Sequence, residues 1–145
     1  MAPRTQPAWL VVLVLTLACD DSECLWELDE LLAEADVGDA ERTSCGSFNG
    51  AQREEVADAL DCLLSTPEGK TAELTVNDCI DCFIESTYVI TGDQRLIKVK
   101  READELGDDV QEVTVSRCDT LRITDNGLIQ CVTPAQAYAC DEPLR

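Results

Sequence analysis

The sequence predicts a single, disulfide-stapled α+β domain in which two N-terminal helices pack on one face of an antiparallel sheet of about five strands. Two observations indicate this fold class. Up to about residue 65, apolar residues recur at three- and four-residue spacing, which is the period of an amphipathic helix. After Gly69 they alternate with polar residues, which is the period of a half-buried strand. The order of these patterns places both helices before the sheet.

The first helix is expected over residues 23–35. Its apolar stripe consists of Leu25, Leu28, Leu32 and Ala35. Ser22 can cap the start of this helix, and Gly38 can end it. Residues 38–50, GDAERTSCGSFNG, are rich in glycine and polar residues and are expected to form a loop.

The second helix is expected over residues 51–65. Asn49 and Gln52 resemble a capping box at its start, and Pro67 and Gly69 end it. The residues expected on its inner face are Val56, Ala59, Leu60 and Leu63.

The strands follow the second helix. They are expected over residues 71–77, 82–91, 95–101 and 110–118 and in a hairpin over 121–132. The hairpin turns at Asn126-Gly127, a dipeptide that favours the positive φ angles of a tight turn. Residues 133–145 are short and mixed, and no element is assigned to them.

The first 18 residues are expected to be a signal peptide, followed by a single cysteine-rich domain over 19–145. Arg4 is the only charge before an uncharged run of eleven residues from Ala8 to Ala18. A membrane-spanning helix needs about 20 apolar residues, so this run is too short to span. A basic start, a short apolar core and small residues before a cleavage site are typical of a secretory signal. The alternative, a buried core helix, would instead alternate apolar and polar faces.

Residues 15–19, L-T-L-A-C, resemble the lipobox of bacterial lipoproteins, in which aliphatic or small residues and Ala precede a Cys. The resemblance covers only Met1–Cys19, and Thr16 stands where the class prefers Leu. It implies cleavage before Cys19 and acylation of that residue. The alternative is cleavage by ordinary signal peptidase, which leaves a secreted protein with a free or intermolecularly paired Cys19. Asp20 resembles an inner-membrane retention signal, but that rule does not hold in all bacteria, so inner and outer membrane stay open.

The cysteine count supports the lipoprotein interpretation. The chain has nine cysteines, so a lipid on Cys19 leaves an even set of eight, as expected of a disulfide framework in an exported chain. Eight cysteines allow 105 pairings. Position in the chain suggests Cys45–Cys62 across the second helix, Cys118–Cys131 across the hairpin and Cys24–Cys140 between the ends of the domain.

Cys79 and Cys82 form the one C-x-x-C motif. Such a pair is redox active when one thiol has a lowered pKa. Here Asp78 and Asp81 flank it, and nearby negative charge disfavours the thiolate. A structural bridge across a β-turn is therefore preferred, with a thiol-disulfide oxidoreductase as the alternative. A zinc site would need a second such pair or histidines.

The charge is strongly acidic. Residues 19–145 hold 10 basic and 30 acidic residues, a net charge of −20, because the first 18 residues contain Arg4 and no acid. This argues against nucleic-acid binding and against charge-driven binding to anionic membranes. The basic residues concentrate in R-L-I-K-V-K-R, a patch of Arg95, Lys98, Lys100 and Arg101. Protection of a sheet edge is the preferred interpretation of this patch, and contact with an anionic polymer or headgroups is the alternative.

The sequence contains no histidine, the commonest general base and metal ligand. The acidic loop at Asp104, Glu105, Asp108 and Asp109 lacks the spacing of an EF-hand calcium loop. No catalytic residue, metal or cofactor is assigned. The expected function is that of a cell-envelope lipoprotein with a structural or binding role, attached to the membrane by lipid and open to a protein partner. The alternatives are the oxidoreductase and an unlipidated secreted binding or inhibitor protein.

Overall fold

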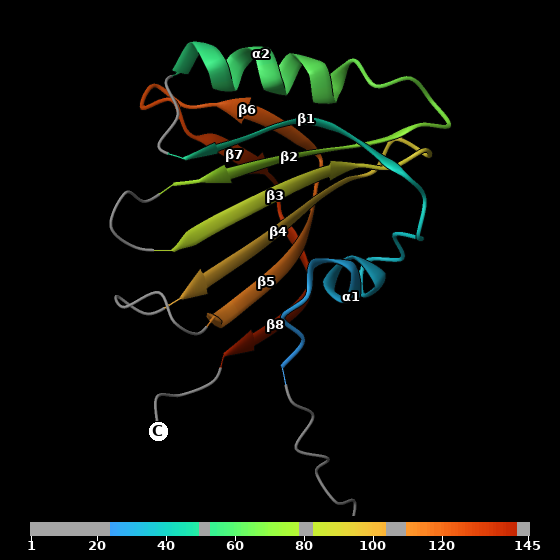
Figure 1. The fold of residues 1–145 in the computed structure, drawn as a ribbon, viewed down its shortest axis with the longest axis vertical. Helices are drawn as coiled ribbons and strands as arrows, with labels where there is room; N and C mark the ends of the chain where they lie inside the picture. Colours follow the sequence, from blue (N-terminus) through green and yellow to red (C-terminus); the bar gives the residue numbers. More distant parts are fainter. Residues whose placement is uncertain (1–23, 50–52, 79–82, 104–109, 142–145) are drawn as a thin grey trace, which may run out of the picture.

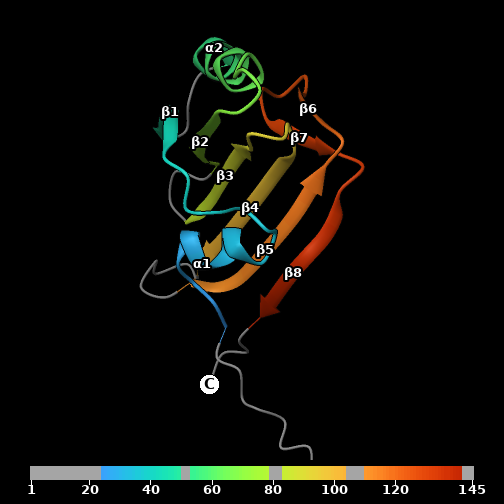
Figure 2. The same ribbon diagram turned by 90° about the vertical axis from the view of Figure 1, so that its right-hand side faces the viewer.

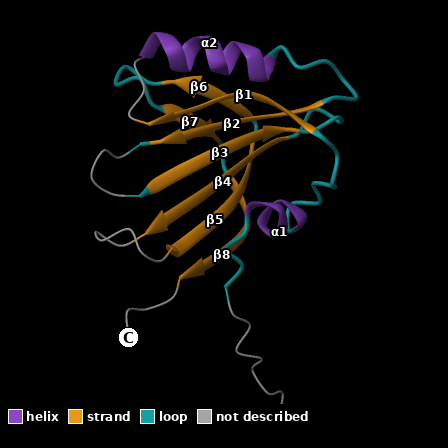
Figure 3. Ribbon diagram, in the orientation of Figure 1, coloured by secondary structure: helices purple, strands orange, loops and turns teal. Residues whose placement is uncertain are grey.

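The computed structural model describes residues 24–49, 53–78, 83–103 and 110–141 (Figure 1). Within these ranges the chain forms two helices and eight strands (Figure 3). In chain order they are α1 (Leu28–Ala33), β1 (Arg42–Asn49), α2 (Arg53–Leu64), β2 (Thr71–Asn77), β3 (Ile84–Ile90), β4 (Leu96–Ala103), β5 (Val110–Cys118), β6 (Thr120–Ile123), β7 (Ile129–Val132) and β8 (Ala135–Asp141).

Six of the strands form one sheet in the order β1-β2-β3-β4-β5-β8, and β6 pairs with β7 in a separate hairpin. β1 is parallel to β2, whereas every other neighbouring pair in the sheet is antiparallel. A parallel pair needs a crossover connection, and α2 supplies it. The sheet is therefore mixed rather than antiparallel.

The predicted α+β arrangement of two N-terminal helices on one sheet face is wrong. Of the described residues, 51% lie in strands and 17% in helices, so the domain is mostly β. A strand separates the two helices, and they belong to different cores. α2 contacts β1, β2 and β3, whereas α1 contacts β4 (Figure 2).

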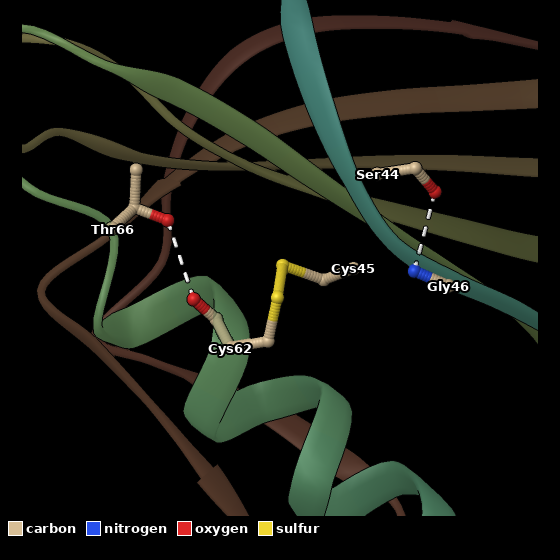
Figure 4. Close-up of a disulfide and its surroundings, with 5 residues drawn as sticks. All are labelled: Ser44, Cys45, Gly46, Cys62 and Thr66. Carbon is tan, nitrogen blue, oxygen red and sulfur yellow. Dashed lines mark hydrogen bonds between the residues drawn. A yellow bond between two sulfur atoms is a disulfide. The ribbon is translucent and has the colours of Figure 1, made fainter.

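β1 occupies the segment that was expected to be a loop. It is an edge strand whose side chains are all exposed or only partly buried, so it shows no apolar alternation. Its pairing with β2 shifts register between Ser44 and Ser47, where Gly46 has a φ of 130°. The Cys45–Cys62 bridge ties this irregular strand to α2 (Figure 4). Tertiary attachment thus makes a strand from residues whose local chemistry favours a turn.

The first helix is six residues long rather than the thirteen expected. The segment before it is held by β8 and β4 instead. Cys24 is bridged to Cys140, and the Leu25 N–H donates to the hydroxyl of Tyr138 at 3.0 Å. Arg101 donates to the carbonyl of Trp26 at 3.2 Å. The Trp26 carbonyl would have accepted an intrahelical hydrogen bond in a longer helix, so its contact with Arg101 replaces one that the helix would have made.

The core has two parts because side chains alternate across the sheet. The first part lies under α2 and the hairpin and is built on Leu74, Tyr88 and Leu96, with the predicted inner face of α2 buried against it. The second lies under α1 and is built on Val89, Ile97, Val99, Val113 and Val115. The two helices therefore cover opposite faces of one sheet.

Three disulfides are present in the described ranges: Cys24–Cys140, Cys45–Cys62 and Cys118–Cys131. These are the three pairings that position in the chain suggests, and they are confirmed. Cys19, the Cys79–Cys82 motif and the acidic loop 104–109 lie outside the described residues. In the described part of the chain, no helix has the length and apolar character needed to cross a membrane.

Candidate functional site

The predicted basic patch is divided by the alternation of β4. Lys98 and Lys100 pair with Tyr88 and Ser86 of β3 and lie on the face that α2 and the hairpin cover. Arg101 points to the other face, where it forms an ion pair with Glu85. β4 is an interior strand of the sheet, so protection of a sheet edge is not the role of these residues.

Arg95 lies just before β4 and joins neither group. Its guanidinium donates to the carbonyl of Ala35 at 3.0 Å and to that of Asp36 at 3.2 Å, and it pairs with Asp93 at 2.8 Å. Arg95 therefore caps the end of the α1 segment. Of the four predicted basic residues, only the two lysines share a site.

The two lysines line a pocket of about 430 Å³ between the sheet and the β6–β7 hairpin. Its volume falls within the usual range of roughly 300–1,000 Å³ for small-molecule sites. β4 and β5 supply a polar wall of Lys98, Lys100, Thr114 and Ser116. The hairpin and the loop that follows it supply Thr124, Leu128, Ile129, Gln130, Cys131 and Pro134.

Lys98 lines this pocket and is half-buried. Its Nζ lies 5.6 Å from the centre of the Tyr88 ring, a cation–π distance. Among the residues that the structure describes, no carboxylate lies within 4.0 Å of this ammonium group. Lys100 differs, because its Nζ is 3.0 Å from a carboxylate oxygen of Glu102.

Burial lowers the pKa of Lys98, because removal from water penalises the ammonium ion. The nearby Asp78 carboxylate opposes that shift, and the positive charge of Lys100 adds to it. Burial, together with the charge of Asp78, raises the pKa of Tyr88 above its ordinary value of 10.0. Tyr88 is therefore a neutral hydroxyl that acts as a donor.

The hairpin wall is held in place at two points. The Cys118–Cys131 bridge joins the end of β5 to β7, with 5.2 Å between the two Cα atoms. The Tyr88 hydroxyl donates to the carbonyl of Ile129 at 3.2 Å, a contact from β3 to β7. Leu128, just before β7, lines the pocket and is 48% exposed. The hairpin wall thus offers the pocket an apolar side chain that protein contacts only partly cover.

A second pocket, of about 250 Å³, is lined by acidic residues around Arg42. The guanidinium of Arg42 pairs with Asp29 at 2.7 Å and with Glu73 at 2.6 Å, so the one positive charge of this lining is already engaged. Over the described ranges no group of three or more cysteines and carboxylates is arranged to hold a metal ion. The pocket at the lysines is therefore the stronger candidate.

Sequence reasoning found Lys98 and Lys100 but missed Thr114, Ser116 and Gln130. Strand parity could have placed Thr114 and Ser116 beside the lysines, since both strands were expected. No local signal shows that the hairpin folds back over them. Comparisons with protein-family models, with curated proteins and with solved structures found no match to this chain.

Proposed function

We propose that this chain is an exported, lipid-anchored binding protein whose pocket receives a small ligand. The observation that carries the binding role is the 430 Å³ pocket under a hairpin held by a disulfide. A cross-linked wall lets the pocket exist before the ligand arrives, which reduces the ordering cost of binding.

The anchor is proposed from the sequence around Cys19. The lipobox-like residues precede it, and its acylation leaves an even number of cysteines. Cys24 is only five residues further on and is bridged to Cys140. An acylated Cys19 would therefore hold the domain close to the bilayer surface, in an oxidising compartment where the bridges persist.

A binding role is preferred to catalysis. The chain contains no histidine, and the pocket lining contains no carboxylate, so the usual general bases are missing from its lining residues. The lining residues are suited to holding a ligand by charge, by hydroxyl groups and by apolar contact.

The anchor is tested by the intact mass of the protein purified from membranes, before and after reduction and alkylation. We expect a chain that begins at Cys19 with added acyl mass, and eight cysteines that react only after reduction. The Cys19→Ala variant should leave the membrane fraction. Equal partitioning of this variant and the wild type would refute the anchor. Ready labelling of Cys79 and Cys82 without reductant would instead favour the oxidoreductase.

The binding role is tested with the exported Cys19→Ala protein, which keeps every described residue and removes the need for detergent. We expect 1-octanol below its solubility limit, or octanoate below its micellar concentration, to bind in isothermal titration calorimetry. Thr114→Phe should weaken binding because it fills the pocket. Thr43→Phe, at an exposed position of β1, is the matched control. Failure of both probes to bind would refute the pocket as a ligand site.

A further inference from the structure

We propose that the pocket selects an amphipathic monoanion, a medium-chain carboxylate, with its head group on Lys98 and its chain against the hairpin. This inference rests on the proposed binding function. It goes further by assigning the ligand's charge and shape.

The charge of the ligand follows from a lysine that has no close ion-pair partner. The chain has 30 acidic residues and 11 basic ones, so a basic side chain has many carboxylates available. Arg95, Lys100 and Arg101, from the same segment as Lys98, each have a carboxylate partner within 4.0 Å. Within the described ranges Lys98 has none at that distance, and the Asp78 carboxylate acts on it only from farther away. Lys98 lies half-buried against a neutral ring. Half-buried charges are costly unless paired, so an incoming anion would supply the missing partner.

The ligand's valence follows from the pocket lining. The lining residues include two lysines and no acid. One of those lysines, Lys100, already shares its charge with Glu102. At most one positive charge is therefore left for the ligand, because the Asp78 carboxylate also acts on Lys98, and this favours a monoanion over a dianion. A dianion would be left undercompensated in a protein with a net charge of −19.

The type of anion follows from the donors around Lys98. Thr114 and Ser116 place two hydroxyl groups on the strand next to it, and neither has a side-chain hydrogen bond within the described part of the chain. A carboxylate needs a few such donors beside one ammonium group. Phosphate sites often add arginine forks or the N–H groups of a helix N-terminus to a lysine, and the residues that line this pocket include neither.

The shape of the ligand follows from the two unlike walls. The strand wall is cationic and hydroxylated, whereas the hairpin wall presents Leu128, Ile129 and Pro134. A molecule that satisfies both has a charged head and an apolar body. The volume of about 430 Å³ lies near the lower end for small-molecule sites, which favours a medium rather than a long chain.

The test compares three probes of equal length, octanoate, 1-octanol and octylamine, by calorimetry on the Cys19→Ala protein at neutral pH and low salt. We expect octanoate to bind about tenfold more tightly than 1-octanol. Octylamine should bind most weakly. Lys98→Met keeps the length of the side chain and removes its charge, so it should abolish the octanoate advantage and leave 1-octanol binding unchanged. Lys70→Met, at an exposed lysine away from the pocket, should change neither.

The outcomes separate this inference from the proposed function. If 1-octanol binds as tightly as octanoate, or if Lys98→Met retains the octanoate advantage, the monoanion inference is wrong and the binding role survives. If none of the three probes binds, both fail. Retained binding of 1-octanol by Lys98→Met shows at the same time that this variant is folded.

Discussion

Replacing Cys118 and Cys131 with alanine should release the β6–β7 hairpin from the sheet and open the pocket. The two cysteines are 13 residues apart in the chain. In the chain-entropy model, a closed loop of this size stabilises the folded state by about 3 kcal/mol. That is a large share of the 5–15 kcal/mol that holds a typical domain together.

The matched control is the double replacement of Cys45 and Cys62. Its cysteines are 17 residues apart, so the chain-entropy model again gives about 3 kcal/mol. The two variants should therefore lose similar amounts of unfolding free energy in urea titration. The slope of that free energy against urea concentration should be the same for both variants. They should differ in where the structure opens, because one bridge holds the hairpin and the other holds β1 to α2.

Hydrogen exchange measured by mass spectrometry locates the opening. Without Cys118–Cys131, the amides of 120–123 and 129–132 should exchange faster by on the order of 100-fold, the equivalent of about 3 kcal/mol. Octanoate binding should fall in the same variant. Without Cys45–Cys62, the hairpin should stay protected and binding should persist. Equal hairpin exchange in the two variants would refute the idea that the Cys118–Cys131 bridge holds the pocket wall.

Three further outcomes are expected. Gly46→Ala should lower the free energy of unfolding by about 1–3 kcal/mol in urea titration, because a φ of 130° is strained for a residue with a Cβ and because that Cβ would lie 2.7 Å from the Phe48 ring. The control Gly38→Ala, whose Cβ would have no atom within 4 Å, should leave the free energy of unfolding unchanged. Octanoate affinity, followed by calorimetry, should fall as pH rises from neutral, because the neutral amine of Lys98 cannot pair with a carboxylate. The midpoint of this loss should lie at a pH below 10.5, the ordinary pKa of lysine, since burial lowers the pKa of Lys98. Tyr88→Phe should cost about 1 kcal/mol in thermal or urea unfolding, because it leaves a buried carbonyl of β7 without its donor.

Long apolar periodicity predicted the elements that the structure confirms. The inner face of α2 and the alternation of β2 are visible in the sequence because both elements bury one face. The tight turn at Gly127, with a φ of 79°, was visible because few residues other than glycine adopt that angle. In each case the local chemistry and the tertiary environment point to the same structure.

The two strands that could not be predicted from the sequence, β1 and β8, are stabilised by contacts with other elements rather than by burial of their own side chains. β1 and β8 are the two edge strands of the sheet, and most of their side chains are at least partly exposed. Burial therefore leaves no alternating signal in either segment. Their backbones are ordered by pairing with β2 and β5 and by disulfides at Cys45 and Cys140. The pairs were suggested by position in the chain, but a bridge does not say whether its ends lie on a loop or a strand.

The basic segment R-L-I-K-V-K-R was interpreted as edge protection because the sequence does not show which sheet faces are covered. As a row of charges, R-L-I-K-V-K-R suggests a surface patch or a protected edge. Strand parity alone separates Lys98 and Lys100 from Arg101, because successive side chains point to opposite faces. What parity does not reveal is that both faces are covered, one by α1 and the other by α2 and the hairpin. On a covered face a lysine needs a partner, and Arg101 has Glu85 while Lys98 has the pocket. Pairing with β3 and β5 makes β4 an interior strand, and the alternation of its side chains places Lys98 and Lys100 in the pocket that we propose as an anion site.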